Sequence, residues 1–479
     1  MNVAAPNSVN YSDQLPLGIE SKSQRKLFFP STGDQYSGDG NNICRIDVSY
    51  DGLCDFQNSY LSFEVENKSA DGHFQFDLGQ PLIQRLRIEC GGVVLEDIQN
   101  YNHLVAGILV PSQNGQSNNH WDAFNATQPA GHSVAAGTLA SGTSALSTVT
   151  LSAAASALLQ SNAGLTGSAG MIQRPSTAAG GQAVSPYTII DPAGKRMVCY
   201  KLISGLLDND KYIPTVLLNA PITIEITFAP AADCGVFEAT KTGTIDISKL
   251  RYVVHTIDLE RSFYDRLRMV QQNSGGVLQI AGTSFRNYSS ALTVSQNQSI
   301  SIPARLRSIK SIFWKIAGAN TQYVYGLSAG GHAHITSYQI KIGGNVYPPS
   351  AIIVDNATNK VTPYLELQKS FGKLGSTVHS DLLSPVNYLV DETGIAAYNK
   401  NTQANANPTH TVAAFAPFGL DLEAFRHEIE NGVDTSSKAL PMSLELGQSA
   451  ATAANPIQIF VMYDSLFYVN MDGTIAVST

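Results

Sequence analysis

Apolar and polar residues alternate with a period of two along much of this chain. The alternation is clear at residues 45–48, 60–65 and 222–228, and it returns at residues 299–302 and 457–461. A period of two places apolar side chains on one face of a β-strand and polar side chains on the other. The pattern therefore predicts an all-β protein whose sheets each bury one face.

Helical patterns are few and short. Asp421 can cap a helix over residues 422–430, and Gly432 follows just beyond its end. Two further short helices are predicted over residues 102–109 and 260–270. The expected class is all-β with a few short connecting helices.

Two segments of the first half recur in the second half. Residues 83–94 alternate into the pair Gly91-Gly92 and out again, and residues 335–346 do the same around Gly343-Gly344. A glycine pair between alternating runs is typical of a two-residue hairpin, which needs positive φ at its centre. Residues 220–226 and 440–446 also share one pattern, apolar-Pro-apolar-hydroxyl-apolar-Glu-apolar.

These matches occur in the same order in both halves. The offset is 252 residues at the glycine pairs and 220 at the prolines, because the first half holds the larger insertion. Two weaker pairs agree with this order, residues 205–208 with 418–421 and residues 251–257 with 458–463. Collinear matches indicate a tandem duplication; generic β patterning that imitates a repeat is the alternative.

The duplication predicts the domain organisation of the chain, which is too long for a single core. We expect an N-terminal arm over residues 1–40, a first β-sandwich over 41–272 and a second over 273–479. Residues 260–270 would form the helix that joins them. Residues 111–193, rich in Ala, Gly, Ser and Thr, are predicted to be a long insertion in the first domain rather than a disordered linker.

Composition and charge exclude several partners. The net charge is −8, only 14% of the residues are charged, and the small cluster Lys22, Arg25 and Lys26 is no basic arm, so no direct contact with nucleic acid is expected. No signal peptide and no apolar run of membrane-spanning length is recognisable, so the protein is not expected to be secreted. Five cysteines at irregular spacing (Cys44, Cys54, Cys90, Cys199 and Cys234) predict buried free thiols.

Some motifs invite a chemical interpretation. Residues 326–330 match the G-x-S-x-G nucleophile elbow around Ser328, but that motif requires a helix after the serine, and a loop followed by a strand is predicted instead. His332 and His334 have the spacing of two metal ligands on one strand, without a third ligand nearby. We expect a glycine-rich turn and two turn histidines.

Three other patterns are equally incomplete. Asp208, Asn209 and Asp210 resemble a calcium loop that lacks its Gly and its closing Glu. Residues 38–43 lack the third glycine of a dinucleotide fingerprint, and no phosphate-binding loop occurs. A basic run at residues 305–310 beside Phe313 and Trp314 is compatible with base stacking, but a strand edge or a subunit contact agrees better with an acidic chain. No catalytic, cofactor-binding or metal-binding residue is therefore assigned, no cofactor is expected, and the protein is predicted not to be an enzyme.

The duplicated all-β unit with a long central insertion resembles the double jelly-roll major capsid proteins of the adenovirus and tectivirus lineage. The resemblance is carried by the hairpin 86–95 with Asn100-Tyr101-Asn102, by its partner 338–349, by residues 418–421 before the strand 440–446, and by the terminal segment 463–473. The size of the chain and the turn Tyr347-Pro348-Pro349 favour the Polinton-like or virophage group.

The resemblance implies a fold of two tandem jelly-roll β-sandwiches with long inserted loops. It further implies a homotrimer that forms a pseudo-hexameric capsomer and tiles an icosahedral shell of a DNA virus. The expected partners are neighbouring capsomers, minor capsid and penton proteins, and an internal membrane, and the expected location is the virion, after synthesis inside the host cell. Residues 111–193 and 355–407 would form surface towers.

Two other functions compete with capsid building. A β-sandwich that binds carbohydrate or serves as a fibre-like attachment protein would also be all-β, but it would usually display a cluster of exposed aromatic residues. The second competing function is an enzyme that uses residues 326–330. Assembly state separates these functions, because a shell protein forms stable trimers and larger arrays.

Overall fold

The computed structural model of the chain describes residues 20–72, 74–112, 125, 190–237, 242–317, 327–328, 330–331, 334–355, 358–374, 383, 388–389, 415–425, 428–437, 440–449 and 455–479. Most of the expected insertion 111–193 and of the second expected tower, 355–407, lies outside these residues.

The first half of the chain forms two antiparallel sheets that face each other. One sheet has the order β1 (Ser21–Phe28), β11 (Ile245–Leu259), β4 (Leu53–Asn67) and β8 (Lys195–Tyr200), and β2 (Gln35–Ser37) also pairs with β11. The other sheet has the order β3 (Ile43–Val48), β9 (Ile222–Phe228), β6 (Ile83–Cys90) and β7 (Val93–Gln99). A short pair, β5 (Phe74–Phe76) and β10 (Gly235–Phe237), lies beside them.

The second half repeats this arrangement. Its first sheet has the order β12 (Val277–Ala291), β20 (Pro456–Asn470), β14 (Ile309–Ala317) and β15 (Gly330–Gly331), with β18 (Phe418–Asp421) on β14 and β21 (Ile475–Ser478) on β20. Its second sheet has the order β13 (Asn297–Ile302), β19 (Met442–Gln448), β16 (Ile335–Ile342) and β17 (Asn345–Ile353).

The two halves share one topology, which confirms the internal repeat. The glycine pairs close the hairpins β6–β7 and β16–β17, and the proline-led strands β9 and β19 occupy the same place between the hairpin and the remaining strand. In the strand register Glu225 lies opposite Arg45 on β3 and Arg87 on β6, and Glu445 lies opposite Ser299 on β13 and Gln339 on β16. The two glutamates therefore hold equivalent positions in the two sheets. One weaker match is wrong: residues 205–208 form a turn, whereas 418–421 form strand β18.

Aromatic residues fill the core of each sandwich, because alternation directs them between the sheets. In the first half Phe63 contacts both Tyr200 and Phe228. In the second half Trp314 lies between Tyr338 and Phe418, with ring centroids 4.8 and 5.5 Å away. These residues are almost completely buried, which is the arrangement expected of two packed sheets.

Two of the three predicted helices are confirmed. Residues 102–109 lie in α1 (Tyr101–Leu104) and the π-helical turn η2 (Val105–Leu109), and residues 260–270 lie in α5 (Arg261–Asn273). The helix predicted after Asp421 is wrong for the residues described there. The Asp421 carboxylate accepts a hydrogen bond from the Glu423 N–H, and the Ala424 N–H donates to the carbonyl of Asn431, so the chain closes a loop.

Among the described residues, three helical segments were not predicted. They are α4 (Ala231–Cys234), η4 (Thr215–Leu217) and α6 (Val361–Ser370). Helix α6 packs over β18 and β14. No helix in the described part of the chain is long and apolar enough to cross a membrane.

The expected N-terminal arm contains sheet strands in its described part. Strand β1 pairs with β11 along its whole length, from Ser21 opposite Leu259 to Phe28 opposite Tyr252. Strand β2 pairs further along the same strand. Residues 21–37 therefore contribute to the first sandwich instead of leaving it.

Candidate interaction surfaces and the junction between the halves

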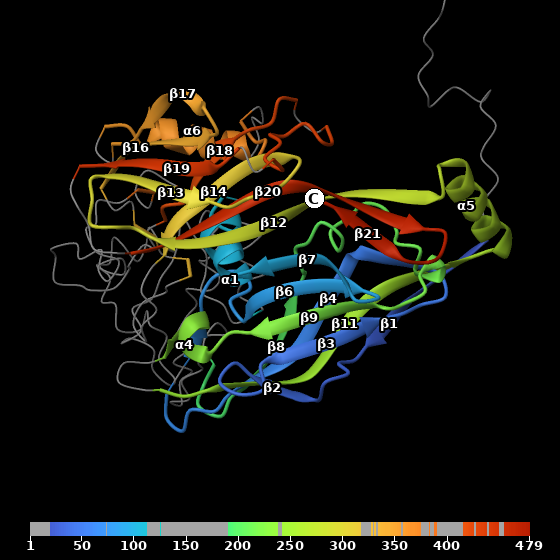
Figure 1. Ribbon diagram of the computed structural model, residues 1–479. Helices are drawn as coiled ribbons and strands as arrows, with labels where there is room; N and C mark the ends of the chain where they lie inside the picture. Colours follow the sequence, from blue (N-terminus) through green and yellow to red (C-terminus); the bar gives the residue numbers. More distant parts are fainter. Residues whose placement is uncertain are drawn as a thin grey trace, which may run out of the picture.

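The halves meet where β7 of the first half lies beside β12 of the second (Figure 1). Asn100, directly after β7, adopts a left-handed conformation with φ 49°. Its side-chain amide donates hydrogen bonds to Asn287, Ser289 and Gln458, at 3.0, 3.0 and 3.1 Å. A single asparagine thus ties the end of β7 to the neighbouring sheet.

A backbone contact between two glycines adds to this junction. A Cβ atom on Gly282 would lie 2.2 Å from the carbonyl oxygen of Gly205, so only glycine fits there. The turn at Gly205 is held by the buried carboxylate of Glu96, which accepts hydrogen bonds from the N–H groups of Gly205 and Leu206, both at 2.9 Å. Burial raises the pKa of Glu96.

A second buried polar cluster lies at the same junction. The Asp77 carboxylate accepts hydrogen bonds from the N–H groups of Leu327 and Ser328, both at 3.0 Å, and from the Ser328 hydroxyl. Lys315 donates from Nζ to the Leu327 carbonyl. Burial raises the pKa of Asp77 and lowers the pKa of Lys315 to about 8. Because both side chains are buried and hydrogen-bonded, removing either of them is costly.

The serine of the G-x-S-x-G match belongs to this cluster. Ser328 is 1% exposed, its hydroxyl donates to Asp77, and the strand β15 follows it where an elbow would start a helix. Gly326 lies outside the described residues. The local structure is therefore a turn held by Asp77, as expected of a structural element.

The other sequence motifs do not assemble a site in the described residues. His332 of the predicted histidine pair lies outside them, and among those described no group of three His, Cys, Asp or Glu residues could hold a metal ion. Asp208 accepts from Lys201 at 2.5 Å, whereas Asp210 accepts from Gln57 at 2.9 Å. The two carboxylates therefore serve different partners.

The basic run also has a structural explanation. Lys310 forms ion pairs with Glu423 and Asp464 at 3.2 and 3.1 Å. Phe313 and Trp314 are fully buried, so neither ring is available to a base. The stacking interpretation of this run is wrong.

The cysteines are free thiols, as predicted. Cys199 is partly buried and the other four are buried. Burial raises the pKa of Cys44 to about 12 and that of Cys54 to about 11.

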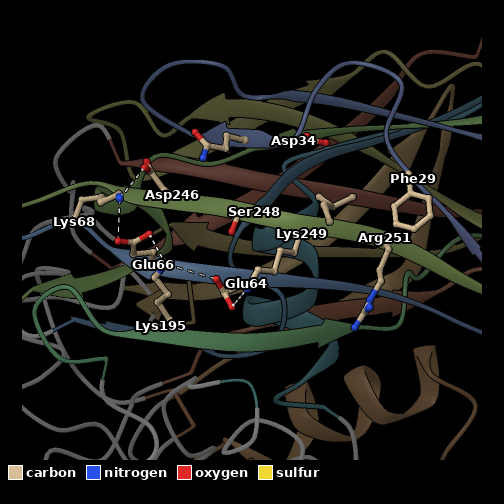
Figure 2. Close-up of a pocket in the computed structure, with 12 residues that line it drawn as sticks. Phe29, Asp34, Glu64, Glu66, Lys68, Lys195, Asp246, Ser248, Lys249 and Arg251 are labelled. Atoms are coloured by element: carbon tan, nitrogen blue, oxygen red, sulfur yellow. Dashed lines mark hydrogen bonds and ion pairs between the residues drawn. The ribbon is translucent and has the colours of Figure 1, made fainter.

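A charged groove crosses the outer face of the sheet formed by β11, β4 and β8. Figure 2 shows Glu64, Glu66 and Lys195 projecting into it, with Phe29 at one end. Its volume is about 640 Å³, and it is lined by four acidic and four basic residues: Asp34, Glu64, Glu66, Asp246, Lys68, Lys195, Lys249 and Arg251.

Most of these charges are paired. Lys68 contacts Glu66 at 2.9 Å and Asp246 at 3.6 Å, and Lys249 contacts Glu64 at 2.9 Å. Asp246 and Lys249 lie on β11, whereas Glu64 and Glu66 lie on β4, so sequence reasoning missed the groove. Its signal in the sequence was charge at the outward positions of alternating strands. Because the acidic and basic side chains neutralise one another, the groove carries no excess of either charge that would select a charged ligand.

The outer face of the sheet that contains β19 has a smaller hollow of about 330 Å³. Polar side chains line most of it, among them Ser299, Gln339 and Glu445. The two hollows lie on different sandwiches, each on the sheet that contains neither β7 nor β12.

The fold is shared with solved viral proteins. No protein-family model matches the sequence, and no curated protein is similar to it in sequence. A chain of the Sputnik virophage structure matches with a TM-score of 0.54 at 10% identity, over 100% of this chain and 93% of that chain.

The Faustovirus major capsid protein matches with a TM-score of 0.51 at 10% identity, over 96% of this chain and 92% of that chain. A capsid chain of PBCV-1 matches with 0.50 at 11% identity, over 98% and 99%. At such identities the likeness concerns the fold, and this chain has the double jelly-roll fold of these proteins.

Proposed function

We propose that this chain is a structural, non-enzymatic major capsid protein. The observation that carries the proposal is the pair of jelly rolls with one topology in a single chain. That arrangement spans nearly the whole length of the Faustovirus and PBCV-1 capsid chains as well. Function does not follow from fold alone, so assembly has to be tested directly.

The duplication suits a shell because of symmetry. A hexagonal lattice needs building blocks with six similar edges, and three chains with two sandwiches each supply six from a closed three-fold oligomer. We propose a homotrimer of this kind as the capsomer. Its partners would be neighbouring capsomers, minor capsid and penton proteins, and an internal membrane, and its location would be the virion.

We propose the domain boundaries in the same terms. The first jelly roll covers residues 41–272 together with strands β1 and β2, and the second covers 273–479. Helix α5 joins them. The insertion 111–193 is the proposed tower of the first domain.

The exposed aromatic residues favour capsid building over carbohydrate binding. Among the described residues, the strongly exposed ones are Phe29, Tyr212 and Phe425, which lie on separate loops. A sugar-binding face would gather such rings on one surface. Their scatter supports a protein that contacts other protein chains.

The deciding experiment is the mass of the purified chain by light scattering, followed by electron microscopy. We expect three times the monomer mass of 51.2 kDa, and hexagonal arrays of the trimer at high concentration. A monomer that binds immobilised glycans would overturn the proposal and favour the attachment protein.

A further inference from the structure

The edge strands β3 and β13 hold equivalent places in the two sandwiches. Each pairs with the proline-led strand of its sheet, β9 or β19, and both show the same alternation of exposed and buried residues. Arg45 on β3 lies opposite Glu225, and Ser299 on β13 lies opposite Glu445. Arg45 and Ser299 are therefore equivalent residues on the outermost strands of matching sheets.

The backbone groups of both residues are directed away from the sheet. Opposite residues of an antiparallel pair alternate between those that exchange hydrogen bonds and those that do not. The carbonyls of Asn42 and Gln296, three residues earlier, accept hydrogen bonds from the last residues of β9 and β19, at 2.8 and 2.7 Å. Three residues further along the pattern has switched, so the N–H and C=O of Arg45 and Ser299 point to the free edge.

Residues 30–32 cover this edge in the first sandwich. The Ser31 N–H donates to the carbonyl of Arg45 at 2.8 Å, and the Arg45 N–H donates to the Thr32 hydroxyl oxygen at 3.2 Å. These residues belong to the long connection between β1 and β3, residues 29–42, which returns along β3. Both outward backbone groups of Arg45 are thereby satisfied.

The corresponding edge of β13 has no such cover among the described residues. There β13 pairs with β19 alone, and the backbone N–H and C=O of Ser299 have no partner. The connection 292–296 is too short to return along the strand, and its Thr293 and Ser295 carbonyls accept hydrogen bonds from the Gln298 side chain instead. An open strand edge of this kind can accept a further strand.

The sequence of residues 1–19 contains the pattern that covers β3. Residues 6–8, Pro-Asn-Ser, match residues 30–32, Pro-Ser-Thr, as a proline, a polar residue and a hydroxyl residue. A Tyr-Ser pair follows both segments, at 11–12 and at 36–37. The N-terminal segment therefore offers a donor and an acceptor in the order that satisfies an outward-facing residue of β3.

The same segment has a long reach. The described part of the chain begins at Glu20. At about 3.3 Å per residue, an extended segment lets Ser8 lie up to about 40 Å from Glu20. A strand of 15 residues such as β12 is about 50 Å long. Residues 1–19 can therefore extend over most of the length of one sandwich.

We propose that residues 1–19 add a short strand to the outer edge of β13. The Asn7 N–H donates to the carbonyl of Ser299, and the Ser299 N–H donates to the hydroxyl oxygen of Ser8, as residues 31–32 do at the edge of β3. The occupant is this segment because the chain uses the same pattern to cover the equivalent edge. The inference does not depend on the proposed function.

The first test compares hydrogen exchange, at single-residue resolution, in the full-length protein and in a variant that lacks residues 1–19. We expect the Ser299 amide to exchange about fivefold faster in the truncated protein, because one net hydrogen bond is lost. The Arg45 amide is the matched control, since its partner Thr32 remains, and it should exchange equally in both proteins. A synthetic peptide of residues 1–19 should restore slow exchange at Ser299.

The second test measures binding of the labelled peptide to the truncated protein by fluorescence anisotropy. Ser299→Pro removes the outward N–H, and proline is tolerated where the N–H of an edge strand faces solvent, so we expect binding to be lost. Ser299→Ala keeps the N–H and should bind the peptide as the parent does. Circular dichroism verifies that both variants are folded.

Two peptide variants require no change in the protein, so they decide the question even if Ser299→Pro fails to fold. Ser8→Ala removes the hydroxyl that accepts from Ser299 and should weaken binding about fivefold. Ser12→Ala, the matched control, should bind as the unchanged peptide does. Equal affinities of the two peptides would contradict the proposed placement of Ser8.

Three other results would overturn the inference. They are equally fast exchange of Ser299 in both proteins, slow exchange that persists without residues 1–19, and normal peptide binding by a folded Ser299→Pro protein. The second result would show that another strand, such as one of a second copy, covers β13. The light-scattering mass tests the proposed trimer separately, and none of these results bears on it.

Discussion

Asp77 of the first half accepts two hydrogen bonds from Ser328 of the second half, one from the backbone N–H and one from the hydroxyl. The residues are 251 positions apart in the chain, and both are buried. Lys315 of the second half lies in the same cluster, so an ionisable side chain of each half is buried against the other half. The junction is therefore stabilised by polar contacts as well as by packing.

Replacing Asp77 should destabilise the whole protein. Asp77→Ala removes the acceptor of three backbone N–H groups, those of Leu78, Leu327 and Ser328, and the carboxylate beside Lys315, so we expect a loss of about 3–5 kcal/mol in the free energy of unfolding. Urea denaturation measures it. Asp210→Ala, which removes one exposed hydrogen bond to Gln57, should change it by less than about 0.5 kcal/mol. Equal effects would contradict the role of Asp77.

The glycine contact between the halves gives a second prediction. Gly282→Ala places a Cβ 2.2 Å from the Gly205 carbonyl oxygen, and the neighbouring backbone must shift. We expect a loss of about 1–3 kcal/mol, as for other overpacked sites. Gly344→Ala is the control, because nothing lies within 4 Å of its Cβ and its φ is not positive. Thermal unfolding of both variants compares them; a Gly282→Ala protein as stable as the control would be inconsistent with close packing.

Local patterns predicted much of the fold. Residues 222–228 and 457–461 alternate because one side of each segment faces the core. That local pattern is sufficient to predict the strands β9 and β20 from the sequence. The glycine pairs at 91–92 and 343–344 predicted two hairpins and revealed the duplication. The helix after Asp421 failed because a capping pattern does not exclude a loop, and α6 was missed because its packing on β18 decides its formation.

Long-range geometry was beyond sequence reasoning. The Ser328 motif was noticed, but its partner Asp77 lies in another domain and no local spacing links them. The charged groove was missed for the same reason, since Glu64, Lys195 and Lys249 come from three strands that meet only in the folded sheet. Sequence predicts which face of a strand is polar, not which strands share that face.

Thiol reactivity tests the burial of the cysteines. At pH 8 the partly buried Cys199 should react with an aromatic disulfide reagent much faster than the other four, since burial raises the pKa of thiols such as Cys44 and Cys54. All five should react in urea. The Cys199→Ser variant should lose the fast phase, and a fast phase that persists would show that another thiol is accessible.

The register of β9 can be tested with one charge. Ile224 is fully buried between the sheets, so Ile224→Asp should prevent folding, because an unpaired carboxylate in the core costs several kcal/mol. Thr227→Asp lies on the outward face of the same strand and should remain soluble and folded. Solubility and circular dichroism distinguish the two. A folded Ile224→Asp protein would mean that the strand presents its other face to the core.

His103 should make stability depend on pH. Burial, with Lys315 nearby, lowers its pKa from 6.5 to about 3, and its Nδ1 has no hydrogen-bond partner. The unfolded chain therefore binds a proton below pH 6.5 that the folded chain does not, so the free energy of unfolding falls as pH drops from 6.5 toward 3.

One proton contributes at most about 1.4 kcal/mol per pH unit to this slope. Asp77, whose pKa is raised, contributes with the opposite sign, but it is present in both proteins of the comparison. His103→Gln should therefore lose less stability than the wild type between pH 6.5 and 4.5 in urea titrations. The two should show the same slope above pH 7, where His103 is neutral in both states. Parallel curves across the acidic range would show that the imidazole reaches solvent.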